Sequence, residues 1–189
     1  MKSFFNEKSS MISKLFVYQI AMSLLGVFVV SPFADTSMCL IAGIFSMLFY
    51  FSLVVYAVIE DGQKDYISVT AGRKQGSVFS GLKYAIVSYI PTIIITVSYM
   101  IARLVSADSF ISGAKLIVNV IVRFFLMGMY LGIDVSLRAE SSPEIFKFIS
   151  ENGIFYCLCL IVMPAVVAIS YALSYKGKIH INTEPKSKK

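Results

Sequence analysis

The 189 residues are unusually apolar: 57% are hydrophobic, only 15% are charged, and the mean hydropathy is +0.77. A soluble domain of this length usually has about 25% charged residues and could not bury so much apolar surface, so the composition excludes a water-soluble fold. The formal charge of +6 suits a protein with basic edges against anionic lipid headgroups, and nothing in it indicates nucleic-acid binding. We therefore predict an all-α integral membrane protein, a bundle of about five membrane-embedded helices. A single membrane domain is expected over 1–175, followed by a basic polar tail over 176–189.

The first two predicted helices cover 14–32 and 38–59, and each is long enough to cross the hydrocarbon core. A Ser-Pro pair ends the first apolar run, and an acidic pair follows the second. The few residues between them predict a tight antiparallel hairpin. The basic and then apolar amino terminus also resembles a signal peptide, but the segment after it lacks the small-x-small cleavage pattern. We expect it to be a retained first span.

Two further spans are predicted over 83–104 and 153–175, with Pro91 and Pro164 near their middles. A proline inside a helix removes one backbone donor and clashes with the preceding turn, so it bends the helix. Both helices are therefore expected to be kinked. Two interpretations remain open: the kinks serve packing alone, or the kinked pair frames a cavity.

The apolar segment 111–133 carries three polar residues at four-residue spacing, Lys115, Asn119 and Arg123, which share one helical face. A charged residue deep in a bilayer is costly and is by default a candidate for function, here for contact with an anionic ligand or with a partner. The helix could span with this stripe facing partners, lie in the interface, or re-enter. The natural counterions in the chain are Asp108, Asp134 and Glu60.

Between the second and third predicted spans lies a charged segment, 60–82, expected to be a cytoplasmic loop. Asp65 could cap a short amphipathic helix that lies on the membrane surface and ends at Gly72. Basic residues at headgroup level gain about 1 kcal/mol each from anionic lipid, so they are candidates for contact with headgroups or with a phosphate-bearing ligand. These candidates are Lys64, Arg73, Lys74 and Lys83.

The same region carries an ordered series of short motifs between residues 60 and 91: an acidic-Gly turn, Lys-Asp, Gly-Arg, Gly-Leu-Lys and Ile-Pro. This series resembles a group of uncharacterised small multi-pass membrane proteins of Gram-positive bacteria, and the segment from Pro164 to Lys176 is similar to their last helix. The resemblance implies a multi-pass protein of the bacterial cytoplasmic membrane and implies no activity.

The distribution of basic residues predicts the orientation. With four full spans and both termini in the cytoplasm, twelve of the 17 Lys and Arg residues lie inside, whereas five spans would leave nine. The positive-inside rule therefore favours four full spans.

The residues that usually carry catalysis are scarce. The only histidine, His180, lies in the polar tail, and the three cysteines are expected to pack as small apolar side chains. No zinc-ligand spacing, Ser-His or Cys-His pair in the spans, or P-loop is present. We therefore predict no enzymatic activity, no catalytic or metal-binding residues and no cofactor.

Gly128 and Gly132 form a GxxxG pair that permits close helix approach, either within the chain or to another subunit. Two functional hypotheses follow from these observations. The first is an accessory or scaffolding subunit of a membrane complex, with a membrane-protein partner or with further copies of itself. The alternative is a small transport or solute-binding subunit with an anionic ligand.

Overall fold

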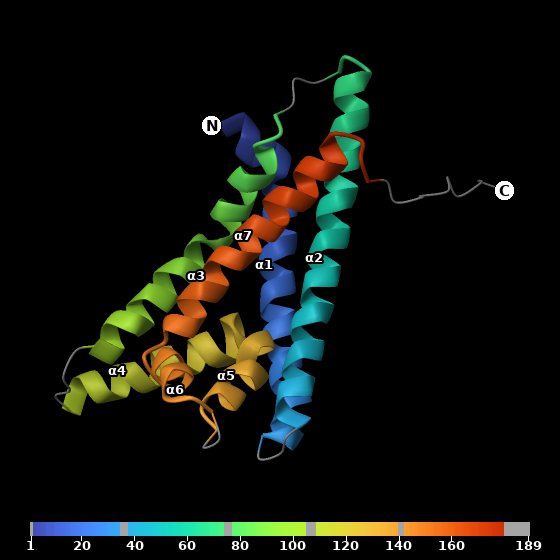
Figure 1. The fold of residues 1–189 in the computed structure, drawn as a ribbon. Coiled ribbons are helices and arrows are strands. Elements are labelled where there is room, and N and C mark those ends of the chain that lie inside the picture. Colours follow the sequence, from blue (N-terminus) through green and yellow to red (C-terminus); the bar gives the residue numbers. More distant parts are fainter. Residues whose placement is uncertain (1, 35–37, 74–76, 105–108, 140–141, 180–189) are drawn as a thin grey trace.

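The computed structural model describes residues 2–34, 38–73, 77–104, 109–139 and 142–179, and all regular structure within them is helical (Figure 1). The elements run in chain order α1 Lys2–Val30, η1 Ser31–Phe33, α2 Met38–Thr70, α3 Ser80–Leu104, α4 Ser109–Val120, η2 Ile121–Leu126, η3 Gly128–Tyr130, α5 Leu131–Leu137, α6 Glu144–Glu151 and α7 Ile154–Tyr175. Elements η1 and η3 are 3-10 helices, and η2 is a π-helix.

Helices α1, α2, α3 and α7 run along the length of the bundle in alternating directions (Figure 1). The start of α1, the last turns of α2, the start of α3 and the end of α7 meet at one end, which we call the terminal end. The elements from α4 to α6 gather at the opposite end, which we call the re-entrant end. Helix α7 packs against both α2 and α3, so it closes the bundle.

Several polar side chains lie in the interior beside the apolar core, and many large apolar side chains lie on the outer surface, where a water-soluble bundle would carry polar ones. On α3, Ser88, Thr92 and Thr96 repeat every four residues and are buried. The outward positions of the chain include Phe28 and Ile161, which are 77% and 70% exposed. Such exposure is stable where hydrocarbon surrounds the helices, because lipid tails solvate apolar side chains and cannot solvate polar ones.

The predicted all-α bundle of apolar helices is confirmed. Within the described residues, four helices are long and apolar enough to cross a membrane, and a bent pair would make a fifth if it is one span. The four are Lys8–Phe33, Met38–Thr70, Ser80–Ile101 and Ile154–Tyr175. Pro91 and Pro164 lie inside α3 and α7, and both helices continue through their proline.

The predicted loop over 60–82 is wrong for its first half. Helix α2 continues without a break through the acidic pair to Thr70, so Asp65 is a buried residue inside a helix and not an N-cap. Gly72, with a φ of 70°, follows the helix end. Hydropathy marks only the lipid-embedded part of a helix, so it could not show that α2 continues outside the apolar region. For the same reason α1 begins at Lys2 rather than at residue 14.

The segment 111–133 is not one helix. Leu116–Leu126 and Gly128–Leu137 are bent by 81° relative to each other, at Met127. Figure 1 shows α3 ending, and α7 beginning, at the same end of the bundle as this segment, which favours the re-entrant alternative. After it comes α6, which the sequence did not reveal. This short helix has Ile145, Phe146 and Phe148 exposed and Ser150 buried.

Candidate functional site: buried charge clusters at the two ends of the bundle

A buried ammonium group lies at the terminal end, between two carboxylates of α2. Lys8 of α1 is 4% exposed, and its Nζ donates to Asp61 Oδ2 at 2.6 Å and to Asp65 Oδ2 at 2.7 Å. Tyr171 of α7 donates its hydroxyl to Asp65 Oδ2 at 2.5 Å. We call these four residues the Lys8 cluster. It ties α1, α2 and α7 together through residues that are far apart in the sequence.

Aromatic rings enclose this ammonium group. Lys8 Nζ lies 5.8 Å from the ring centroid of Tyr84 and 5.9 Å from that of Tyr171, and the two rings meet edge to face. Close backbone approach makes room for them: a Cβ on Gly81 would lie 2.5 Å from Tyr171 Cβ. The cation is thus held by two carboxylates and two ring faces, an arrangement that offsets the cost of removing it from water.

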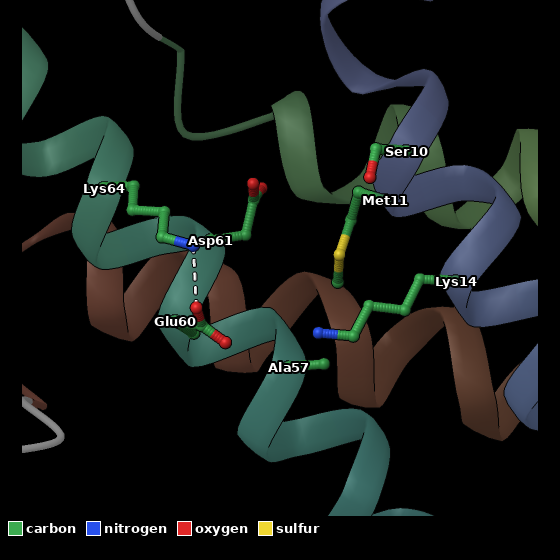
Figure 2. Close-up of a pocket in the computed structure, with 7 residues that line it drawn as sticks. All are labelled: Ser10, Met11, Lys14, Ala57, Glu60, Asp61 and Lys64. Carbon is green, nitrogen blue, oxygen red and sulfur yellow. Dashed lines mark hydrogen bonds and ion pairs between the residues drawn. The ribbon is translucent and has the colours of Figure 1, made fainter. Parts of the chain in front are cut away.

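A pocket opens between α1 and α2 next to the Lys8 cluster (Figure 2). It encloses about 430 Å³ of empty space, including its open mouth. Its lining residues are Ser10, Met11, Lys14, Ala57, Glu60, Asp61 and Lys64. Lys64 Nζ bonds to Glu60 Oε1 at 2.6 Å, one helical turn apart on α2. Asp61 belongs to both features, so the pocket and the Lys8 cluster form one polar region.

The second charge cluster lies at the re-entrant end around Asp134, which is fully buried. Two guanidinium groups reach Asp134 Oδ2, Arg123 Nη2 at 3.2 Å and Arg138 Nη2 at 3.1 Å. The Tyr156 hydroxyl donates to the same oxygen at 2.9 Å, and Ser150 Oγ donates to Oδ1 at 2.5 Å. We call these five residues the Asp134 cluster. It joins the bent segment, α6 and α7.

The Asp134 cluster contains one of the three residues of the predicted polar stripe. This residue, Arg123, is paired with Asp134, one of the three expected counterions. The side-chain oxygen of Asn119 is buried without a hydrogen-bond partner among the described residues. The side chain of Lys115 lies outside the described residues, as does Asp108. The third expected counterion, Glu60, lies at the terminal end with Lys64.

Of the four basic residues predicted to contact headgroups, the three that the structure describes lie at the terminal end. Lys64 and Lys83 are exposed on α2 and α3, and Arg73 is exposed just after α2. Lys74 lies outside the described residues. The sequence reasoning missed the Lys8 cluster and Lys14. A signal was present, because Asp61 and Asp65 are four residues apart and share one face if the helix continues.

The GxxxG glycines pack inside this chain. A Cβ on Gly128 would lie 2.2 Å from the carbonyl oxygen of Ser23 on α1, and one on Gly132 would lie 2.6 Å from that of Cys39 on α2. The Gly128 amide also donates to Ser23 Oγ at 3.0 Å. Of the two alternatives for this pair, close approach within the chain is therefore the one that its surroundings favour.

A buried polar layer lies between the two charge clusters. The Gln19 amide donates to the Leu126 carbonyl at 3.1 Å and accepts from Thr92 Oγ1 at 3.0 Å. The hydroxyls of Tyr50 and Tyr89 are hydrogen-bonded to each other. This layer therefore connects α1, α2, α3 and the π-helix by bonds that apolar side chains could not make.

The chain matches no protein-family model, no curated protein and no solved structure. In the part of the chain that the structure describes, no group of three or more His, Cys, Asp or Glu residues could hold a metal ion. The four long apolar helices and the inward-facing polar groups indicate a membrane protein.

Proposed function

We propose that this chain is an accessory or scaffolding subunit of a complex in a bacterial cytoplasmic membrane. The observation that carries the proposal is that the buried charged side chains among the described residues are paired with charged partners inside the chain. Lys8 is bound by Asp61 and Asp65, and Arg123 is bound by Asp134. Charges that transport a solute must be free to exchange partners, whereas charges that are bonded to neighbouring helices hold a rigid body together. The proposal assigns no catalytic role to any residue.

The projecting part of α2 supplies a surface for a partner. At about 1.5 Å per residue, its 33 residues extend about 50 Å, whereas the hydrocarbon core is about 30 Å thick. Figure 1 shows the last turns of α2 beyond the other helices at the terminal end. Ile67, which is 65% exposed there, and the exposed Arg73 are available to a partner at the membrane surface.

The terminal end is proposed to be cytoplasmic. Among residues whose backbone the structure describes, the helix bounds place eight basic residues toward the terminal end and five toward the re-entrant end. Those at the terminal end are Lys2, Lys8, Lys14, Lys64, Arg73, Lys83, Lys176 and Lys178. The positive-inside rule assigns the more basic side to the cytoplasm. The loop pattern that resembles proteins of Gram-positive bacteria supports a bacterial cytoplasmic membrane.

The alternative, a small transport or solute-binding subunit for an anionic ligand, required a cavity between the two proline-containing helices. Helices α3 and α7 pack directly against each other through two edge-to-face ring pairs, Tyr84 with Tyr171 and Tyr99 with Tyr156. The pocket described above, among the described residues, lies between α1 and α2 and is not lined by Arg123. These contacts count against the transport hypothesis.

Native mass spectrometry after extraction from the native membrane in mild detergent tests the proposal. We expect the chain to appear with a second polypeptide, or with further copies of itself, in a fixed ratio. Ile67→Asp should remove this association, because it places a charge on the projecting turns of α2. Phe79→Asp, the same kind of change at an equally exposed apolar residue directly before α3 at the same end, serves as the matched control and should keep it. A strictly monomeric chain with no bound polypeptide would contradict the proposal.

A further inference from the structure

The pocket between α1 and α2 lies where the apolar parts of both helices end. Lys14 immediately precedes the apolar run of α1, and Glu60 immediately follows that of α2. In a membrane, this level is the boundary between the hydrocarbon and the headgroups. Of its lining residues, Met11 and Ala57 are apolar and buried, whereas four others carry a charge.

The charges around the pocket balance. Lys14 and Lys64 contribute two ammonium groups to its lining, and Glu60 and Asp61 contribute two carboxylates (Figure 2). The adjoining Lys8 and Asp65 add one charge of each sign. A ligand with a net charge would gain little from such surroundings, whereas a ligand with both a cationic and an anionic group could use both signs.

Lys14 is the cation in the pocket that is best placed to receive an anion. It extends from α1 toward α2, and its Nζ lies 5.7 Å from the ring centroid of Tyr18 (Figure 2). It has no carboxylate within ion-pair distance among the residues that the structure describes, and it interacts with the Glu60 carboxylate only at longer range, whereas Lys64 is bonded to Glu60 and Lys8 to Asp61. An ammonium group beside the hydrocarbon gains most from a phosphate oxygen, through a charge-assisted hydrogen bond.

We propose that this pocket binds the headgroup of one aminophospholipid, a zwitterion with a phosphate and a primary ammonium group. Lys14 holds the phosphate, and the carboxylates of Glu60 and Asp61 accept hydrogen bonds from the ammonium group. The acyl chains then extend along the apolar surface below the pocket. This assignment does not depend on the subunit role proposed above, since a monomer could bind the lipid as well.

Native mass spectrometry of the chain from nanodiscs tests this site. The nanodiscs contain equal amounts of phosphatidylethanolamine, phosphatidylcholine and phosphatidylglycerol with matched acyl chains. We expect one retained lipid per chain, with phosphatidylethanolamine enriched about fivefold over the other two, as expected for about 1 kcal/mol from partly exposed ionic contacts. Lys14→Met keeps the apolar stem and should lower the retention of all three lipids, because each carries the phosphate that Lys14 holds. Glu60→Gln should lower the enrichment of phosphatidylethanolamine, because it removes a carboxylate that accepts from the ammonium group. Lys176→Gln, which removes an exposed charge from the same end but outside the pocket, should keep both the full retention and the full enrichment.

Three outcomes would overturn the assignment. Equal retention of the three lipids would mean that the pocket does not select a headgroup. Full lipid retention in Lys14→Met together with full enrichment in Glu60→Gln, with thermal unfolding unchanged, would remove these residues from the contact. Complete displacement of the lipid by soluble phosphoethanolamine would assign the pocket to a free phosphate ester rather than to a lipid.

Discussion

Each end of the bundle buries an ionised group between two groups of opposite charge, and the central charge has a different sign at each end. At the terminal end, Lys8 binds two carboxylates, Asp61 and Asp65. At the re-entrant end, Asp134 binds two guanidinium groups. In both clusters a tyrosine of α7 donates its hydroxyl to a carboxylate, Tyr171 at one end and Tyr156 at the other. A bilayer tolerates ionised groups at helix ends when neighbouring helices supply the opposite charge and the remaining hydrogen bonds.

The clusters differ in how far apart their members are in the sequence. Asp134 lies 11 residues from Arg123 and 22 from Tyr156, so its cluster organises one local region. Lys8 lies 57 residues from Asp65, which lies 106 from Tyr171. The Lys8 cluster therefore holds together helices that form separately. The comparison indicates that the Asp134 cluster shapes the bent segment, whereas the Lys8 cluster sets how α1, α2 and α7 associate.

Asp134→Asn should have the largest effect on stability. The variant leaves two partly buried guanidinium groups, with exposed side-chain fractions of 21% and 26%, without their carboxylate. Breaking a buried ion pair from one side typically costs about 3–5 kcal/mol. Reversible unfolding in mixed micelles of mild detergent and SDS measures it. Glu144→Gln, at an exposed acidic residue of α6, is the control and should cost little; equal costs for both variants would contradict a central role for Asp134.

Lys8→Met should come second, with a cost of about 2–4 kcal/mol, because water at the headgroup level can partly solvate the carboxylates left behind. The comparison is sharpened by adding Asp65→Asn to Lys8→Met. If the two residues interact as the structure describes, the double variant should be more stable than the sum of single effects predicts, by about 1–3 kcal/mol. Additive costs in the same unfolding assay would mean that the pair does not couple α1 to α2.

Gly128→Ala should cost about 1–3 kcal/mol, since the added methyl group would overlap the Ser23 carbonyl and force α1 away from the bent segment. This change tests whether backbone packing, and not charge alone, holds the re-entrant end. Gly113→Ala on α4 is the matched control, because a Cβ there meets nothing within 4 Å. The control should be neutral or slightly stabilising, given the better helix propensity of alanine. A Gly128→Ala variant as stable as the control in the unfolding assay would argue against this contact.

The two tyrosines of α7 that donate to the charge clusters, Tyr156 and Tyr171, should give the smallest effects and the most direct comparison. Tyr171→Phe should cost about 1–2 kcal/mol, because it removes a hydrogen bond to a charged acceptor. Tyr156→Phe should cost less, about 0.5–1 kcal/mol, since Asp134 keeps two guanidinium groups and the Ser150 hydroxyl. Measured side by side by the same unfolding assay, a larger cost for Tyr156→Phe would reverse this ranking of the two clusters.

The amino-acid sequence alone determined the class of protein and the approximate placement of four apolar helices. These features follow from local composition and length, because any run of about 20 apolar residues has the same preference for lipid wherever it lies in a chain. The counterion of Arg123 was also within reach of sequence reasoning, since Asp134 is close to it along the chain.

Tertiary structure decided the features that depend on distant residues. Helix α2 continues beyond Glu60, where its carboxylates meet an ammonium group from α1, and hydropathy gives no sign of that partner. The helix break at Met127 accompanies the packing of Gly128 against the backbone of α1 at Ser23. These two residues are 105 positions apart in the sequence. The pocket between α1 and α2 exists only because these helices lie side by side. The hydropathy pattern of one segment indicates which solvent that segment prefers, but it does not indicate which other segment will pack against it.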